Sequence, residues 1–396
     1  MKTKIRLSQL LVIGCFFGFF LFCLVWGIAQ PDRPSSAAEN RSLAQRPAMR
    51  RVVTDFVGFA KDFESYAADQ FPDREQLIGV YTALELAQGK KFARKAYCLQ
   101  GGWLLTKPTP TKPADLSALQ QALAQAGALD RPLVWCVLPL KNEALYDLEP
   151  AYFSDETGET NKQALTAALA QVEGLTVIDA EAPLVTGTLA DREQYFYKTD
   201  FHWNARGAFA AAQEIARQLA GAGTIAETSV PQAEDFLWSE LGGERRYQGD
   251  LNVWFSNQFS MQEDIPRYVP KNAADLRYFL HPGDIESVPR ETIVGSGLDK
   301  DPVTYNDVFT YNLGYYRVEN PAAPEAASVL ILKDSFQNAT IDYLSAIFRS
   351  VTVVDPRSYQ ETPDLASLLD ADGIDLVLFF YHQNNVSREL IDFLSA

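Results

Sequence analysis

Histidine is scarce in this chain, with three in 396 residues, and cysteine and methionine are nearly as rare, with four and three. The few histidines leave few candidates for acid–base chemistry. Because no Cys-x-x-Cys motif or cluster of cysteine and histidine is present, we predict neither a metal site nor another cofactor. Basic residues form only short patches within a net charge of −16, which excludes nucleic acid as a partner, since phosphate binding needs concentrated lysine and arginine.

One long hydrophobic segment is present, from Leu10 to Ala29. As a helix it would be about 30 Å long, the thickness of the hydrocarbon layer of a bilayer. We therefore predict an uncleaved transmembrane anchor within residues 1–30, which contacts the cytoplasmic membrane through residues 9–29. Cleavage near Ala29 is the alternative.

The charges beside this segment predict its orientation. Lys2, Lys4 and Arg6 precede it, so the positive-inside rule places the N-terminus in the cytoplasm and the rest of the chain outside the cell membrane. Val12 to Cys15 is similar to a lipoprotein cleavage site, but the apolar segment continues well past Cys15, which disfavours lipidation.

The remainder divides into a stalk and a folded domain. Residues 31–51 are polar and contain several prolines, so we predict an extracytoplasmic stalk, followed by one domain over residues 52–396. Cys98 and Cys136 are the thiols of this domain. They can pair outside the cell, but Cys136 lies in an apolar run, which favours two buried thiols.

Short apolar runs alternate with helical patterns through most of the domain, which indicates an α/β fold with a mainly parallel sheet flanked by helices. A pair of helices broken at Pro72 precedes this pattern. The predicted strands are Leu133–Leu138, Thr176–Ile178, Ser328–Leu332, Ser350–Val354 and Leu376–Tyr381. The predicted helices are Asp115–Ala126, Thr160–Val172, Ala205–Gly221, Phe336–Ile347 and Asp364–Leu369. Residues 223–316 show no sustained period, so we expect an irregular β-rich insertion there.

His202 is the histidine best placed for chemistry. It lies two residues after Asp200, so in an extended segment both side chains point to one face, and the carboxylate can orient the imidazole. A satisfied buried pair explains an isolated Asp-x-His equally well. A metal site is less favoured, because no third ligand stands at a convincing spacing.

Ser335 follows a predicted strand and begins a predicted helix, at the strand end where α/β enzymes place ligands. The N–H groups at a helix N-terminus can stabilise an oxyanion. Asp334 or Ser335 can equally be a helix cap, and for a strand-Asp-Ser-helix junction alone capping is the simpler explanation.

The segment Tyr197-Lys-Thr-Asp-Phe-His-Trp-Asn204 resembles the signature of the DHHW proteins and of the alginate O-acetyltransferase (AlgX/AlgJ) family, whose domains are SGNH-hydrolase-like. Further blocks are similar and stand in the family's order: Glu39–Leu43, Tyr66–Arg74, Gly101–Leu104, Leu138–Lys141, Lys333–Phe336 and Phe380–Asn385. The resemblance implies an SGNH-hydrolase-like fold with a triad of Asp200, His202 and Ser335. Oxyanion or substrate contacts are expected at Lys333, Asp334 and Asn385, with Asn384 as the alternative to Asn385, and at Trp203.

Two positions depart from the pattern. Phe201 stands at the second position of the tetrad, where the acetyltransferases also lack histidine, so the triad is unaffected. Lys333 replaces a glycine of many relatives, and its long side chain would either crowd the oxyanion site or bind an anionic substrate.

The resemblance implies an O-acetyltransferase or acetylesterase that acts on an envelope polysaccharide or cell-wall glycan, with a multi-span membrane acyltransferase as a partner if the reaction is transfer. The alternative is a non-catalytic polysaccharide-binding or scaffold protein that uses the aromatic residues Trp238, Tyr247 and Trp254.

Overall fold

The structure is a computed structural model that describes residues 7–36, 41–93, 96–149, 156–241, 246–259, 263–361 and 364–396. It divides into two compact units. One comprises Met1–Ala93 with Val253–Gln258, and the other Arg94–Asn252 with Phe259–Ala396. The predicted boundaries of anchor, stalk and SGNH-hydrolase-like domain, at residues 30 and 51, stay a prediction.

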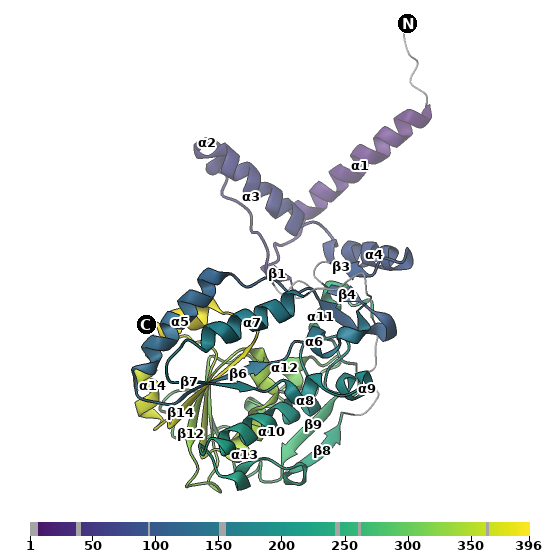
Figure 1. The fold of residues 1–396 in the computed structure, drawn as a ribbon. Coiled ribbons are helices and arrows are strands. Elements are labelled where there is room, and N and C mark those ends of the chain that lie inside the picture. Colours follow the sequence, from purple (N-terminus) through teal and green to yellow (C-terminus); the bar gives the residue numbers. More distant parts are fainter. Residues whose placement is uncertain are drawn as a thin grey trace. The chain divides into compact units, whose positions relative to one another are not determined.

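The first unit is mainly helical (Figure 1). Its helices are α1 (Leu7–Ala29), α2 (Arg51–Thr54), α3 (Phe56–Asp69) and α4 (Arg74–Ala87), and its short strands are β1 (Ser35–Ser36), β2 (Arg41–Ser42) and β3 (Phe92–Ala93). The break at Pro72 between α3 and α4 is as predicted. Within α1, Ser8–Gly27 is long and apolar enough to cross a membrane. Lys2, Lys4 and Arg6, on which the predicted orientation rests, lie outside the described residues, as do Glu39 and Asn40.

A seven-stranded sheet forms the centre of the second unit, in the order β10-β11-β13-β12-β14-β6-β7. Its strands are β6 (Leu133–Leu138), β7 (Leu175–Asp179), β10 (Arg277–Phe279), β11 (Tyr315–Glu319), β12 (Ser328–Lys333), β13 (Ser350–Val354) and β14 (Leu376–His382). The strands from β13 to β7 are parallel, whereas β11 is antiparallel to β13, and β10 to β11. The predicted α/β fold with a mainly parallel sheet is confirmed.

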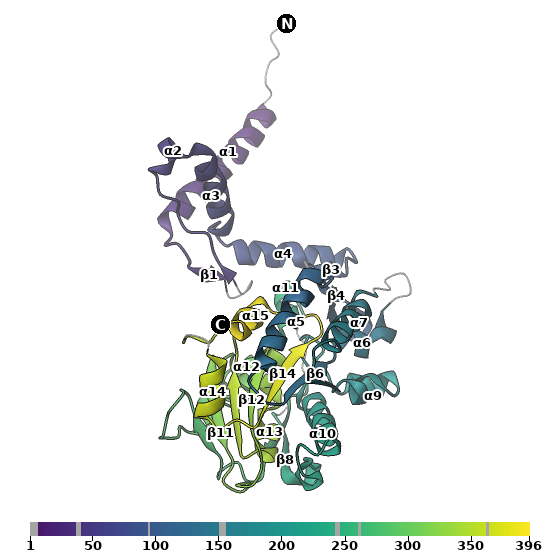
Figure 2. The same ribbon diagram turned by 60° about the vertical axis from the view of Figure 1, so that its left-hand side comes forward.

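Helices cover both faces of this sheet (Figures 1 and 2). On one face lie α5 (Pro113–Gly127), α7 (Thr157–Leu169), α14 (Leu365–Ala371) and α15 (Arg388–Leu394). On the other lie α8 (Ala182–Val185), α10 (Ala205–Gly221) and α13 (Ile341–Ile347). Every residue of β6, β12 and β13 is buried, which explains why these strands are mostly apolar on both faces rather than alternating.

The remaining elements are short. They are β4 (Ala96–Cys98), β5 (Leu104–Thr106), β8 (Phe236–Glu240), β9 (Pro266–Pro270), α6 (Lys141–Ala144), α9 (Leu189–Glu193), α11 (Asp250–Trp254), α12 (Tyr305–Val308) and the 3₁₀ helices η1 (Gln100–Gly102), η2 (Tyr146–Leu148), η4 (Glu227–Ser229), η5 (Ala233–Asp235), η6 (Arg290–Thr292) and η7 (Ser335–Ala339). Two predictions need correction. The expected insertion, residues 223–316, is irregular in its described part, but it also extends the central sheet through β10 and the start of β11. The helix predicted over Phe336–Ile347 is two short helices, η7 and α13.

All four cysteines lie among the described residues, and Cys15, Cys23 and Cys136 are free thiols. Cys136 is buried in β6, and burial raises the pKa of its thiol. Cys98 is only partly buried.

Candidate active site

Ser335 lies directly after β12, at the carboxyl edge of the parallel strands. It begins η7, and the preceding residue, Asp334, is the N-cap. One oxygen of the Asp334 carboxylate accepts from Phe336 N at 2.9 Å, and the other from His382 N at 2.9 Å and Asn385 Nδ2 at 3.1 Å. Asp334 thus fills the capping role that the sequence left open between it and Ser335, and Ser335 keeps its hydroxyl for another partner.

That partner is His202. Its Nε2 lies 2.8 Å from Ser335 Oγ, and its Nδ1 lies 2.7 Å from Asp200 Oδ1. The imidazole and the carboxylate are buried, whereas Ser335 is only half-buried. The three residues that the sequence singled out are therefore brought together, although 133 positions separate the histidine from the serine.

Asp200 and His202 meet in a turn rather than in the extended segment that the sequence suggested. Residues 198–202 are a bend, in which Asp200 Oδ1 also accepts from the backbone N of His202 at 3.0 Å. The side chain of an aspartate commonly closes such a turn on the N–H two residues later. This bond fixes the carboxylate beside the imidazole.

The second oxygen of Asp200 contacts the irregular insertion. Oδ2 accepts from Tyr247 OH at 3.1 Å and from Asp250 N at 3.0 Å. Burial alone would raise the pKa of Asp200, but the attraction of His202 and the N–H donors lower it overall, so Asp200 stays ionised. An ionised carboxylate at this place favours the imidazolium that forms when His202 takes a proton.

Trp203 contacts the backbone of the residue that follows Ser335. Its Nε1 donates to the carbonyl oxygen of Phe336 at 3.0 Å, and Tyr305 OH donates to the same oxygen at 3.2 Å. The Tyr305 ring also stacks on the His202 ring, with centroids 3.9 Å apart and planes 5° apart. Trp203 is fully buried, and its observed contact is with the backbone of residues 334–336, here called the serine turn. The predicted contact of Trp203 with a substrate stays a prediction.

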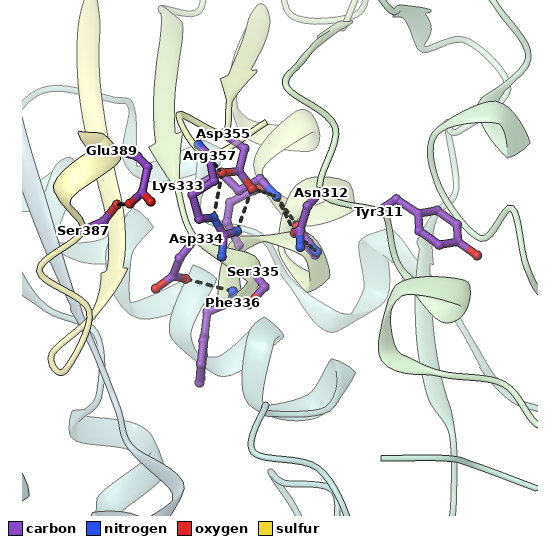
Figure 3. A network of polar contacts seen from close by, with 12 residues as sticks. Tyr311, Asn312, Lys333, Asp334, Ser335, Phe336, Asp355, Arg357, Ser387 and Glu389 are labelled. Atoms are coloured by element: carbon purple, nitrogen blue, oxygen red, sulfur yellow. Dashed lines mark hydrogen bonds and ion pairs between the residues drawn. The ribbon is translucent and has the colours of Figure 1, made fainter. Parts of the chain in front are cut away.

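Lys333 is fully buried, and its ammonium lies in a polar network beside the serine turn (Figure 3). Nζ donates to Asn338 Oδ1 at 2.5 Å and Asn312 Oδ1 at 3.2 Å, and lies 3.4 Å from Asp355 Oδ2. Burial lowers the pKa of Lys333 to about 8, although Asp355 opposes the shift. These partners hold the ammonium inside the protein. None of these contacts corresponds to the two roles considered for Lys333, which were to crowd the oxyanion site or to bind an anionic substrate.

Asn385 is the nearer of the two candidate asparagines to the serine turn. Its amide donates to Asp334 at 3.1 Å, whereas Asn384 Oδ1 accepts from Asn161 Nδ2 at 2.5 Å. Each amide has two N–H groups, so the contact with Asp334 leaves one N–H of Asn385 for an oxyanion. That role stays a prediction.

Asp250 supplies the third potential metal ligand that spacing did not reveal. Within the described part of the chain, ligand atoms of Asp200, His202 and Asp250 lie within 4.8 Å of one another. Both nitrogens of His202 are already engaged, with Asp200 and Ser335, so a metal would have to displace one of these contacts. The hydrogen-bonded arrangement fits a triad better than a metal centre.

Part of the chain matches a known family. Residues 103–275, which include Asp200 and His202 and end before Ser335, match the family described as "SGNH hydrolase-like domain, acetyltransferase AlgX". The chain carries an SGNH hydrolase-like domain. No curated protein sequence matches the chain significantly.

Solved structures share the fold of this SGNH hydrolase-like domain. PatB1 of Bacillus cereus aligns with a TM-score of 0.63 and 22% identity over 75% of this chain and 99% of that chain. The same protein with a sulfonyl adduct aligns with a TM-score of 0.62 and 23% identity, over 74% of this chain and 95% of that chain. A DHHW family protein from Eubacterium siraeum aligns with a TM-score of 0.58 and 18% identity, over 76% of this chain and 94% of that chain. The predicted relationship to DHHW and AlgX-type proteins is confirmed.

Sequence reasoning missed Tyr247, Asp250 and Tyr305, which complete the site of the SGNH hydrolase-like domain. All three lie in the irregular insertion, where no periodicity marks them. Tyr247, one of the three aromatic residues named for the alternative of glycan binding, is buried against Asp200, and its ring stacks on that of Tyr197 with centroids 4.2 Å apart. Gly249 was a usable signal beside them, because a Cβ at this position would clash with the carbonyl of Thr199.

Proposed function

We propose that this chain is a serine-dependent O-acetyltransferase or acetylesterase of the bacterial cell envelope, which acts on a polysaccharide or cell-wall glycan. One observation supports the proposal above all others: Asp200, His202 and Ser335 form a continuous hydrogen-bonded series, with distances of 2.7 and 2.8 Å, that ends in a half-buried hydroxyl. The matched family is described as an acetyltransferase, which is consistent with acyl-ester chemistry.

The contacts define the reaction in two halves. His202 Nε2 takes the proton of Ser335 as Oγ attacks the acyl carbonyl, and then gives this proton to the departing alcohol as the ester C–O bond breaks. The acyl-serine is released when a sugar hydroxyl or water loses its proton to His202 and attacks. Asp200 keeps the imidazole oriented and stabilises its charge. The Ser335 N–H and Asn385 would stabilise the oxyanion.

A sulfonyl fluoride tests the nucleophile directly, and PatB1 has been solved with a sulfonyl adduct. With phenylmethylsulfonyl fluoride, the Oγ–S bond forms, the S–F bond breaks, and His202 takes the serine proton. We expect one adduct by intact-mass spectrometry and loss of turnover of p-nitrophenyl acetate. Ser335→Ala should show neither adduct nor turnover, whereas Ser239→Ala, at an exposed serine of β8, should keep both. Unchanged turnover in Ser335→Ala would refute the assignment.

Placement in the membrane is part of the same proposal. The apolar segment Ser8–Gly27 supports an anchor, with the N-terminus in the cytoplasm and the SGNH hydrolase-like domain outside. If the reaction is transfer, acyl groups must cross the membrane, so we propose a multi-span membrane acyltransferase as the supplying partner. A gene for such a protein beside this one, and co-purification of the two proteins from membranes, would support transfer over hydrolysis.

A non-catalytic glycan-binding role has less support. Of the three aromatic residues considered for it, Tyr247 is buried in the triad's hydrogen-bond network, and Trp254 is half-buried. Trp238 is exposed, but Arg206 lies over its ring at 4.7 Å.

A further inference from the structure

A cavity of about 310 Å³ lies at the carboxyl edge of the central sheet, two strands from the serine. Three loops line it: the one after β10, the one before β11 and the one after β13. The strand directions bring these loops to the edge where Ser335 lies, because β13 runs parallel to β12 and β11 runs antiparallel to β13. Leu332 pairs with Val354, and Val354 with Tyr315. Neighbouring strands are about 4.8 Å apart, so Tyr315 lies roughly 10 Å across the sheet from Leu332, which precedes the serine turn.

The buried polar network of Figure 3 links the serine turn to Asn312 and Asp355, and the loops that contain these two residues line the cavity. Lys333, two residues before Ser335, donates to Asn312 and pairs with Asp355. Asn312 leads into the cavity wall at Leu313, and Asp355 begins the loop that supplies Tyr359. Both walls are therefore fixed relative to Ser335 by contacts with one ammonium.

The walls are held in place before any ligand arrives. The Tyr359 ring makes an edge-to-face contact with Phe393, with centroids 5.5 Å apart, and Tyr315 OH donates to Asp372 at 2.9 Å. Gly314 lets the loops meet, because a Cβ there would clash with the carbonyl of Ser358. A pocket that is already formed binds with a smaller loss of conformational entropy.

The chemistry of the lining suits an uncharged sugar. Tyr359 combines a flat apolar ring with a hydroxyl group, and His281 and Gln360 add hydrogen-bonding groups beside it. Glu361 is the acidic residue of the lining, and neither lysine nor arginine is among the lining residues that the structure describes. A carboxylate without a facing cation repels an acidic sugar but accepts hydrogen bonds from hydroxyl groups.

We propose that this cavity, here called the tyrosine pocket, is a glycan subsite that binds a neutral hexose or N-acetylhexosamine unit of the polymer and thereby places a neighbouring hydroxyl or ester at Ser335. The inference rests on the proposed function for the identity of the reaction. To the proposed function it adds the class of sugar that is bound and the residues that select this sugar. Acidic polysaccharides are expected to be poor substrates.

Equilibrium binding tests the subsite independently of catalysis. The full-length protein in detergent is titrated with chitopentaose, without an acyl donor, by calorimetry. Tyr359→Ala is expected to weaken binding about tenfold, as expected for loss of an aromatic contact with a sugar ring. Tyr359→Phe should bind within about twofold of the wild type. Trp238→Ala, which removes an exposed aromatic of β8, should leave binding unchanged.

Charge selection is tested with an acidic probe. Oligogalacturonate of the same length should bind more weakly than chitopentaose to the wild type, and Glu361→Gln should narrow this difference. Absence of chitopentaose binding, tighter binding of oligogalacturonate, or unchanged binding in Tyr359→Ala would each overturn the subsite.

Turnover of p-nitrophenyl acetate separates the two proposals. If Ser335→Ala retained turnover while Tyr359→Ala lost chitopentaose binding, the reaction would be wrong and the subsite would stand. If Ser335→Ala lost turnover and chitopentaose binding did not depend on Tyr359, the subsite would be wrong and the reaction would stand.

Discussion

Two carboxyl groups stand beside His202, and they differ in charge near pH 6. Asp200 is ionised, as its four hydrogen-bond donors require. The Asp250 residue is exposed, but its carboxyl group is largely surrounded by protein. Burial, and next the charge of Asp200, raise its pKa to about 6. Above pH 6, Asp250 therefore adds a second negative charge near the imidazole, and below it the group is neutral.

This difference predicts a pH-dependent effect of Asp250→Asn. At pH 8 the substitution removes a charge that favours the imidazolium, so we expect kcat/KM for p-nitrophenyl acetate to fall about fivefold, the effect of one charge at the protein surface. At pH 5, where the native carboxyl is protonated, the variant should nearly match the wild type. The ratio of variant to wild type is measured across pH, because the titration of other groups cancels in it. A flat ratio would contradict the role of Asp250.

At the scale of elements, the bend at residues 198–202 is held from two sides. Lys141, at the start of α6, donates to the carbonyl oxygens of Leu104, Lys198 and Asp200 at 2.7, 2.9 and 2.7 Å. Glu263 accepts from Thr199 N at 3.0 Å and also contacts Thr199 Oγ1 and Lys198 N. Burial lowers the pKa of Lys141 to about 7, opposed by Glu263 and Asp200. The two residues position the bend that carries Asp200 and His202.

Lys141→Met should therefore be costly. It removes the Nζ donor from three carbonyl oxygens and leaves Glu263 without its nearby cation, and we expect a loss of about 3 kcal/mol in the free energy of unfolding. Urea denaturation measures this loss. Lys198→Met is the matched control, because the Lys198 ammonium makes a 3.5 Å contact with Gly101 O and lies 5.7 Å from the centroid of the Trp103 ring, both weak contacts, and it should change stability by less than about 0.5 kcal/mol. Equal losses in the two variants would exclude the proposed role of Lys141.

The elements were predictable where burial dictates them. β6 and β13 have the predicted bounds, because strands covered on both faces are mostly apolar instead of alternating. The bend at Asp200 was not predictable from periodicity, since it depends on Lys141, Glu263 and Gly249, which are distant in sequence. Asp200, His202 and Ser335 were found through residue type, strand-end position and resemblance. Tyr305 and Asp250 carry no local signal, because their roles arise only from tertiary contacts.

At the scale of the whole molecule, the proposed attachment to the membrane depends on α1. Deletion of residues 1–30 should move the protein from the membrane fraction to the soluble fraction and retain turnover of p-nitrophenyl acetate. Cys15→Ser distinguishes the alternative of a lipid anchor: it should leave the protein in the membrane after a carbonate wash, and release of this variant would indicate lipidation. The intact mass of the wild type, 44.1 kDa for the uncleaved chain, tests for cleavage near Ala29.

The contacts of Asp200 Oδ2 come from Tyr247 and Asp250, within the irregular insertion, whereas the serine turn is fixed by β12 and β14. Part of what sets the reactivity of His202 thus lies in stretches of the insertion outside the sheet strands. Substitutions in the insertion can retune the basicity of the histidine while every ladder of the sheet stays intact. A homologue that keeps the sheet strands and replaces the stretch around Tyr247 and Asp250 would keep the serine in place. The hydrogen-bond donors to Asp200 would differ.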